Sequence, residues 1–449
     1  MQFQGLIGVV VLIAIAYALS TDRRAINWRI VAAGILLQGT LAFLLLRFEP
    51  IVQLFDIFAA IVTKVISFAD EGTRFIFGRV AEDTLPDGSP APWGFIFAVR
   101  VLPIIIFFCA LMTVLYHVGL MQRVVAAVAW VLRRTLGITG AEALSSAANI
   151  FLGQTEAPLV VKPYIAGMTR SQIMAIMTGG FATIAGSVMA VYIGMLGRAY
   201  AQVLGVPPDQ GQVLFAKHLL TASVMSAPAG LLMAKIMLPE TGRPRPETVD
   251  ALMADERSTR NIMDAAAAGA GDGLKLALNV AAMLVAFVAL LAMVNWPLAA
   301  LCEVNTSWFP IASWREAHGI PVLKLQTILG YILTPLAWCI GVPWSDAPTL
   351  GTLLGTGVIA TEFVAYLDLA SGMKATTLSP RTAAIATYCL CGFANIPSIA
   401  IQIGGLSAMA PDRRSDLATI APRAMVAGAL ACWMTGAIAS VFVWSSDRS

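Results

Sequence analysis

Two glutamates stand alone in otherwise apolar stretches of the sequence. Glu156 is the only charged residue of segment 143–161, and Glu362 is the only one of segment 347–367. An acid inside a membrane segment is costly and is by default a functional candidate. A carboxylate accepts charge-assisted hydrogen bonds from neighbouring hydroxyls, which favours a polyhydroxylated or amide-bearing solute. The alternative is a structural ion pair or a helix-to-helix contact.

Neutral polar side chains cluster around these glutamates or in the segments that follow them. They are Asn149, Gln154, Thr155, Thr183, Asn395 and Ser398. Singly, each is typical of a hydrogen bond between membrane helices, whereas together they predict a polar pocket. Pro397 cannot donate to the carbonyl of Phe393. It predicts either a local break that exposes backbone oxygen or a kink without a ligand.

The composition requires a membrane around these residues. Of 449 residues, 58% are hydrophobic and only 12% are charged, against about 25% charged in soluble domains. A water-soluble enzyme and a disordered chain are excluded. The net charge of +3 implies no nucleic-acid partner. The six cysteines show no CxxC spacing and are interpreted as small buried hydrophobes.

Nine runs of at least 17 residues lack Asp, Glu, Lys and Arg. They are 1–21, 30–46, 101–122, 171–197, 218–234, 276–302, 325–345, 382–411 and a last run within 424–446. A helix needs about 20 residues to cross a bilayer. If 325–345 crossed, Arg413 and Arg414 would lie opposite Arg23 and Arg243, against the positive-inside rule. We therefore expect eight transmembrane helices with both termini outside. Run 1–21 is interpreted as a retained span.

The remaining apolar segments predict helices that do not cross. Segments 143–161 and 347–367 contain Gly or Pro breakers, as re-entrant hairpins do. Segment 325–345 is expected to be an interfacial or hairpin-associated helix. Segments 119–134 and 50–70 are candidates for interfacial helices. Segment 239–264 is rich in Pro, Arg and Glu and is expected to be a hydrophilic linker.

Two short patterns recur in the same order along the chain. The pair Thr155-Glu156 returns as Thr361-Glu362, 206 positions later, and GFATI at 180–184 returns as GFANI at 392–396, 212 positions later. On the expected topology the two units enter the membrane from opposite sides. Inverted repeats with broken helices are typical of secondary transporters, whose substrate site lies near the midplane.

Four motifs make the chain recognisable: GQTEAPL at 153–159, GFATIAGSV at 180–188, TEFVAYLDL at 361–369 and the segment 391–416. Together they resemble the concentrative nucleoside transporters over nearly the whole chain. The resemblance implies an all-α, polytopic, homotrimeric symporter in a bacterial inner membrane, with scaffold and transport domains. The implied divisions are N-terminal scaffold 1–118, transport repeat 1 at 119–238, linker and scaffold span 239–302, and transport repeat 2 at 303–449.

The resemblance also implies roles for individual residues. On the nucleobase they would be Gln154, Thr155 and Glu156, with Val188 and Phe393 in apolar contact; on the ribose, Glu362, Asn395 and Ser398. Sodium would meet the side chains of Asn149 and Thr183 and the carbonyls of Leu152 and Ile184. Pro397 departs from the small Ser or Gly usual in the family, which affects the ribose side.

The expected activity is cation-coupled uptake of a nucleoside such as uridine or adenosine by elevator-type alternating access. Sodium is the expected coupling ion and a proton is the alternative, because burial raises a carboxyl pKa. A passive facilitator or channel could use the same pocket. An enzyme is not expected, because His117, His218 and His318 are scattered, and no GxxxxGK[ST] loop indicates ATP drive.

Overall fold

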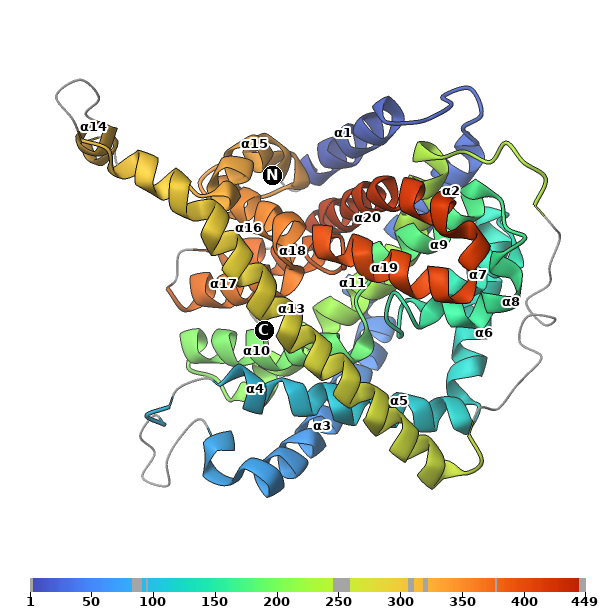
Figure 1. Ribbon diagram of the computed structural model, residues 1–449, viewed down its shortest axis with the longest axis horizontal. Coiled ribbons are helices and arrows are strands. Elements are labelled where there is room, and N and C mark those ends of the chain that lie inside the picture. The colour runs from blue at the N-terminus through green and yellow to red at the C-terminus, as the bar shows by residue number, and fades with distance from the viewer. Residues whose placement is uncertain are drawn as a thin grey trace.

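The chain folds into a bundle of helices (Figure 1). The computed structural model describes residues 3–82, 91–93, 96–244, 259–305, 311–317, 322–375 and 378–443. The α-helices are α1 (Gln4–Ala18), α2 (Trp28–Leu46), α3 (Glu49–Phe77), α4 (Phe97–Arg100), α5 (Leu102–His117), α6 (Leu120–Leu136), α7 (Gly140–Ala148), α8 (Lys162–Ile165), α9 (Arg170–Ala182), α10 (Gly186–Leu204), α11 (Pro208–Met237), α13 (Ile262–Glu303), α14 (Ile311–Ala317), α15 (Leu325–Ile340), α16 (Ala347–Ile359), α17 (Glu362–Lys374), α18 (Pro380–Cys389), α19 (Ile396–Met409) and α20 (Arg414–Phe442). The expected all-helical class is confirmed.

Seven helical stretches in the described residues are long and apolar enough to cross a membrane. They are Trp28–Leu46, Glu49–Ala81, Phe97–His117, Arg170–Leu204, Pro208–Met237, Ile262–Cys302 and Pro411–Phe442. This set differs in membership from the eight expected spans. Glu49–Ala81 is included by length, although the sequence suggested an interfacial helix there. The helix in the expected span 1–21 is only 15 residues long, and the expected span 382–411 is interrupted between α18 and α19.

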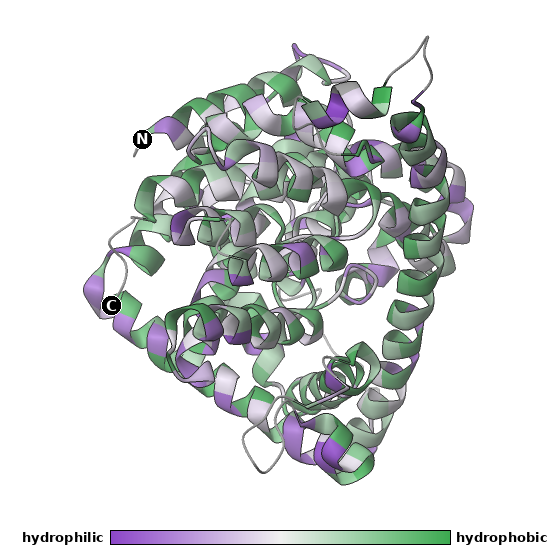
Figure 2. Ribbon diagram, turned by 90° about the vertical axis from the view of Figure 1, so that its left-hand side faces the viewer, coloured by the Kyte–Doolittle hydropathy of each residue, from purple (hydrophilic) through white to green (hydrophobic). Residues whose placement is uncertain are grey.

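The apolar helices form an inner and an outer group. The most apolar windows of Arg170–Leu204, Pro208–Met237 and Pro411–Phe442 are 94%, 89% and 78% buried, whereas the window of Ile262–Cys302 is 6% buried. In Figure 1, α13 of the outer group runs diagonally across one face of the bundle. Figure 2 shows that hydrophobic residues extend over the outer helices as well. An apolar outer surface is what a bilayer accommodates.

Small residues let the outer helices pack closely. Ala265, Gly269, Gly273 and Ala277 are buried on one stripe of α13, and α13 packs along α5. A Cβ at Gly269 would lie 2.6 Å from Thr113 Oγ1, and one at Gly273 would lie 2.8 Å from Ile106 Cα. The close approach therefore depends on the missing side chains, as in small-xxx-small packing of membrane helices.

Two of the expected spans are broken. Segment 171–197 divides into α9, which ends at Ala182, and α10, which begins at Gly186; segment 382–411 divides into α18 and α19. The expected role of Pro397 needs correction. It lies in the first turn of α19, with Asn395 as N-cap. Helices tolerate proline at that position because the first amides need no intrahelical acceptor. The break precedes the proline.

Two helix–turn–helix units coincide with the glutamate-bearing segments. In hairpin 1 (140–165), α7 packs against the 3-10 helix Ala157–Val161, which leads into α8; in hairpin 2 (347–374), α16 packs against α17. The α15 helix packs along α16, in agreement with its expected association with a hairpin. The α6 helix precedes hairpin 1 and is bounded by Gly119 and Gly137, both with positive φ. Of the expected linker 239–264, residues 245–258 lie outside the described part.

Candidate functional site

The two broken spans touch at their breaks. The amide of Phe393 donates to the carbonyl of Thr183 at 3.3 Å. Thr183 and Asn395, which occupy matching places in the recurring GFATI and GFANI patterns, share one extended conformation, with φ/ψ of −128°/163° and −131°/159°. A side chain at Gly392 would have a Cβ 2.6 Å from the carbonyl oxygen of Phe181. The repeated sequence thus produces the same local backbone twice and places both copies side by side.

Glu362 lies beside this crossing at the first turn of α17. Its side chain is 6% exposed, and Thr361 caps the helix by accepting from the amide of Val364. Glu362 Oε2 accepts from Asn395 Nδ2 at 2.7 Å, and Oε1 accepts from the hydroxyl of Tyr192 at 3.1 Å. Within the described chain, no basic side chain lies within ion-pair distance of this carboxylate. The alternative of a structural ion pair is therefore not supported at Glu362, whereas its bonds to Asn395 and Tyr192 are contacts between helices.

Hydrogen bonds extend this network to the tip of hairpin 1. Asn395 Oδ1 accepts from the amide of Ser398 at 2.8 Å, and the Ser398 hydroxyl accepts from Gln154 Nε2 at 3.2 Å. Gln154 Oε1 accepts from Gln402 Nε2 at 3.1 Å. A Cβ at Gly180 would lie 2.7 Å from Gln402 Nε2 and 2.9 Å from Gln154 Cβ. We call the group of Gln154, Tyr192, Glu362, Asn395, Ser398 and Gln402 the polar network.

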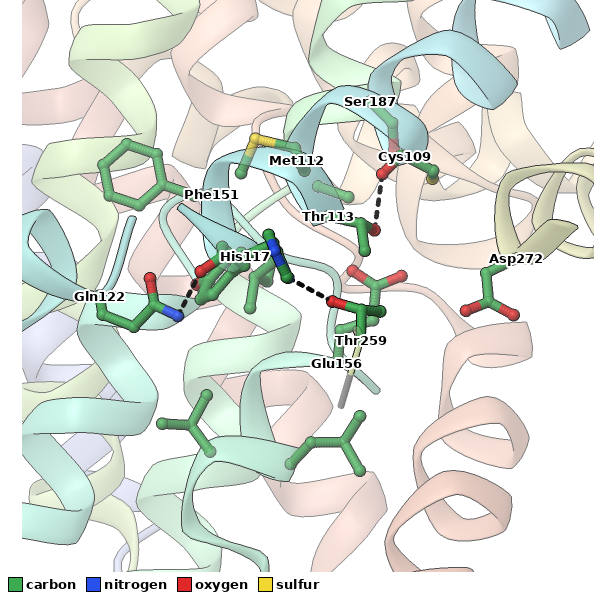
Figure 3. Close-up of a pocket in the computed structure, with 15 residues that line it drawn as sticks. Cys109, Met112, Thr113, His117, Gln122, Phe151, Glu156, Ser187, Thr259 and Asp272 are labelled. Atoms are coloured by element: carbon green, nitrogen blue, oxygen red, sulfur yellow. Dashed lines mark hydrogen bonds between the residues drawn. The ribbon is translucent and has the colours of Figure 1, made fainter. Parts of the chain in front are cut away.

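Glu156 faces a different space, a cavity of about 410 Å³ between hairpin 1, α5 and α13. Figure 3 shows its carboxylate among side chains of α5, with Asp272 of α13 on the far side. Glu156 Oε2 accepts from the amide of Gly153 at 3.2 Å. No hydrogen bond among the described residues joins it to Glu362. Glu156 and Glu362 therefore line two different spaces in this structure.

The other expected substrate residues lie around these two regions. Thr155 packs against α19, where a Cβ at Gly405 would lie 2.8 Å from Thr155 Cγ2. Val188 is 8% exposed in the first turn of α10, next to Ser187, which lines the cavity. Phe393 is partly buried against the core. A second space of about 20 Å³ adjoins Glu362 and is too small for a nucleoside-sized ligand.

The expected cation ligands come from two segments joined by a hydrogen bond. The amide of Gly186 donates to the carbonyl of Phe151 at 3.0 Å, which ties the turn containing Asn149 and Leu152 to the break containing Thr183 and Ile184. Asn149 is fully buried, yet neither atom of its amide has a hydrogen-bond partner in the described structure. The Thr183 hydroxyl donates to the carbonyl of Gly179, which leaves its oxygen able to accept.

This donor set fits a hard monovalent cation. Buried amide groups are ordinarily paired, so the unpartnered Asn149 amide is available to a ligand. Neutral side-chain and carbonyl oxygens at unwound backbone are typical sodium ligands in transporters. In the described ranges, no three His, Cys, Asp or Glu side chains form a cluster for a transition metal.

Tyr192 and Gln402 were missed by reasoning from the sequence. Tyr192 is four residues after Val188, and Gln402 is four residues after Ser398. Positions i and i+4 share a face of a helix, so extending each expected contact by one turn would have found both. Tyr192 also stacks on Tyr366, with ring centroids 4.1 Å apart.

These features define a class: polytopic helical membrane proteins with broken helices and a buried polar site, as in secondary transporters. Three family models match the chain, described as Na+ dependent nucleoside transporter N-terminus (residues 7–80), nucleoside recognition (98–199) and Na+ dependent nucleoside transporter C-terminus (218–440). The chain belongs to the concentrative nucleoside transporter family. This is a family of transporters and not of enzymes.

Relatives and solved structures cover the whole fold. An uncharacterized transporter of Haemophilus influenzae is 44% identical, over 98% of this chain and 97% of its own. Solute carrier family 28 member 3 of Homo sapiens is 38% identical, over 97% of this chain and 59% of its own. The structure of CNTnw in an inward-facing substrate-bound state is 42% identical, covers all of both chains and gives a TM-score of 0.85. A CNTnw double variant in an outward-facing state gives 0.84, with 41% identity over 98% of this chain and 97% of that one.

Proposed function

We propose that this protein is a sodium-coupled nucleoside symporter. The observation that carries the proposal is the polar network, in which hairpin 1, hairpin 2 and the broken span α18–α19 meet through neutral hydrogen-bonding groups and one carboxylate without a basic partner in the described structure. The family membership supports the substrate class. The relatives named sodium/nucleoside cotransporter 1 support the coupling ion.

The proposed substrate contacts follow the order of the network. Gln154, Thr155 and Glu156 address the nucleobase, directly or through water, with Val188 and Phe393 in apolar contact. The ribose hydroxyls bind Glu362, Asn395 and Ser398, because an ionised carboxylate accepts two hydroxyl protons and each charge-assisted bond is worth about 1.5–3 kcal/mol. In the structure Gln154 and Ser398 bond each other. A nucleoside between them replaces that contact with its own.

Sodium is proposed at Asn149, Leu152, Thr183 and Ile184. The unpartnered Asn149 amide oxygen would be one of the oxygen atoms that coordinate the ion. These residues lie on the same turn as Gln154 and on the break beside Phe393. A cation there would order the hairpin tip that contacts substrate. Each ligand then raises the affinity for the other by the same factor.

The proposed architecture is an inverted repeat moving within a scaffold. The buried inner helices α9–α11 and α20 belong to the proposed transport repeats 119–238 and 303–449, and the outer helices α2, α3, α5 and α13 belong to the scaffold parts 1–118 and 239–302. We propose eight crossings, re-entrant hairpins, periplasmic termini, a bacterial inner membrane and a homotrimer. The matching backbone at Thr183 and Asn395 supports the repeat.

Uptake of radiolabelled uridine and adenosine into proteoliposomes tests the function. With an inward sodium gradient the internal concentration should exceed the external one, and replacing sodium by choline should abolish accumulation. Accumulation driven by a proton gradient without sodium would indicate the proton alternative. Equilibration without accumulation under both gradients would indicate a passive facilitator and would refute the proposal.

A further inference from the structure

A buried ion pair lies at the base of hairpin 1, apart from the polar network. Glu142 in the first turn of α7 contacts Lys235 near the end of α11 at 2.5 Å, and their side chains are 2% and 6% exposed. Lys235 Nζ also donates to Ser171 Oγ at 3.0 Å and lies 3.6 Å from Glu240 Oε2. Removing one partner of such a pair leaves an uncompensated buried charge.

Hydrogen bonds around this pair tie three helix ends together. The second Glu142 oxygen accepts from the amide and hydroxyl of Thr139, the N-cap of α7. The hydroxyl of Thr139 also accepts from Gln172 Nε2 at 3.0 Å, in the first turn of α9. Ser171 Oγ donates to the carbonyl of Leu238, the C-cap of α11, at 2.8 Å. The starts of α7 and α9 and the end of α11 are therefore joined at one point, which we call clamp 1.

The other arm of hairpin 1 is also fixed at its base. Arg413, at the start of α20, donates to the carbonyls of Ala166 and Met168 at 2.9 and 2.7 Å. The Arg413 guanidinium is itself held by Asp416 at 3.0 Å. Both arms of hairpin 1 are thus attached to other helices at the end away from the tip.

Hairpin 2 has a corresponding group at its base, which we call clamp 2. Asp346, the N-cap of α16, accepts from the hydroxyls of Ser379 and Thr382 at 2.8 and 2.6 Å, at the start of α18. Arg381 donates to the carbonyls of Gly341, Ser440 and Val443. The start of hairpin 2, the start of α18 and the end of α20 are joined here.

The two clamps occupy equivalent places in the sequence. Thr169 and Ser379, 210 positions apart, are the N-caps of α9 and α18; Leu238 and Val443, 205 positions apart, are the C-caps of α11 and α20. These offsets are close to the 206 and 212 of the recurring motifs. Each clamp contains an acid at the base of its hairpin and a basic residue, but the basic residues differ in place: Lys235 lies in the last turn of α11, whereas Arg381 lies at the start of α18 and binds near the end of α20.

The hairpin 1 tip contrasts with its base. Among the described residues the tip makes neutral hydrogen bonds and no ion pair: buried Asn149 has an unpartnered amide, Gln154 bonds side chains of α19, and the Phe151 carbonyl accepts from Gly186. We propose that clamps 1 and 2 are positioning sites that hold the hairpin bases rigid, so that substrate and cation admission requires movement of the tips alone. This inference rests on the proposed function for its transport readout, whereas the rigidity of the bases is a property of the protein without ligand.

Hydrogen–deuterium exchange of the full-length protein in nanodiscs, without nucleoside or sodium, tests the rigidity directly. Glu142→Gln keeps the side-chain shape and removes the charge that pairs with Lys235. We expect about tenfold faster exchange in 140–168 and unchanged exchange in 347–374. Asp346→Asn should give the opposite pattern. Glu71→Gln, at an exposed site on α3, is the matched control and should change neither.

Transport kinetics then separate positioning from general stability. In proteoliposomes at saturating uridine, Glu142→Gln should raise the sodium concentration for half-maximal uptake about tenfold. Asp346→Asn should raise it less than threefold. The conservative variant Lys235→Arg, which retains the charge, should stay within threefold of the unmodified protein. Equal faster exchange over the whole chain in both variants, or no local change in either, would overturn the clamp proposal.

The two failures are distinguishable. If the unmodified protein accumulates no nucleoside, the proposed function fails while the exchange experiment still decides the clamps. If Glu142→Gln does not fold, Lys235→Arg and Asp346→Asn keep the comparison available, because clamp 2 makes no buried ion pair and tolerates loss of one charge more readily.

Discussion

Glu362→Gln is the substitution that most directly probes the polar network. Glutamine has nearly the same shape, and its amide oxygen could accept from Asn395 Nδ2 as Glu362 Oε2 does at 2.7 Å. Its amide nitrogen would then face Tyr192, whose hydroxyl can accept as well as donate. The bonds to Asn395 and Tyr192 are then both kept without substrate, so we expect normal folding and a melting temperature within about 2 °C of the unmodified protein.

The loss should appear on binding. A neutral amide cannot accept two charge-assisted hydrogen bonds from ribose hydroxyls, and losing one such bond costs about 1.5–3 kcal/mol. This corresponds to roughly a 10- to 100-fold higher uridine KM. Radiolabelled uptake at saturating sodium measures it, with 2′,3′-dideoxyuridine as a probe that lacks the hydroxyls. An unchanged KM for uridine, or an equal rise for both nucleosides, would refute the assignment of Glu362 to the ribose.

Three further predictions concern single residues. Asn149→Ala should raise the sodium concentration for half-maximal uptake about tenfold or more by removing one ligand, while thermal stability changes little because its amide has no partner in the described structure; a sodium titration of uptake checks this. Tyr192→Phe loses the 3.1 Å bond to Glu362 but keeps the ring stack on Tyr366, so the uridine KM should rise about two- to tenfold, which parallel uptake curves measure. Partial burial raises the pKa of Asp346, but hydrogen bonds from Thr382, Ser379 and Ser345 outweigh it and set the pKa below its ordinary 3.8; its contribution to stability is therefore present above pH 3.8 and lost as pH falls through the lower folded value. Asp346→Asn should accordingly melt earlier at pH 7, and melting curves taken at decreasing pH should show the difference vanish only in strong acid.

Membrane spans and hairpins were predictable because both leave long-range composition signals. The charge-free runs located most of the long helices but not Glu49–Ala81, and the breakers around Glu156 and Glu362 located the turns of the two hairpins. The break at Thr183 was not predicted from its residues, because Ser171 to Gly197 reads as a continuous apolar helix. The other broken span, 382–411, stabilises that break through the bond from the Phe393 amide to the Thr183 carbonyl. Only a contact between distant segments explains it.

The site was predicted as a set of residues but not as an arrangement. Gln154, Glu362, Asn395 and Ser398 do lie in one network, as the recurring motifs indicated. Glu156, only two residues from Gln154, faces a separate cavity. In a tight turn, successive side chains point in different directions, and the direction depends on backbone dihedrals that motif spacing does not encode. That Glu156 and Glu362 line different spaces could therefore be seen only in the structure.

The hydrogen bonds already made by the network bear on how a nucleoside can bind. Gln154 is bonded to both Ser398 and Gln402, so a substrate that takes these partners exchanges protein contacts for its own. Because each neutral bond contributes only about 0.5–1.5 kcal/mol net, this exchange would add little affinity at Gln154 and Ser398. It would disfavour solutes that leave Gln154 or Ser398 unpaired, since an unsatisfied buried group costs about 1–3 kcal/mol. With the proposed contacts, the larger gain would come from the carboxylate of Glu362 and from a cation at the hairpin tip, whereas the exchange at Gln154 and Ser398 would contribute mainly to selectivity.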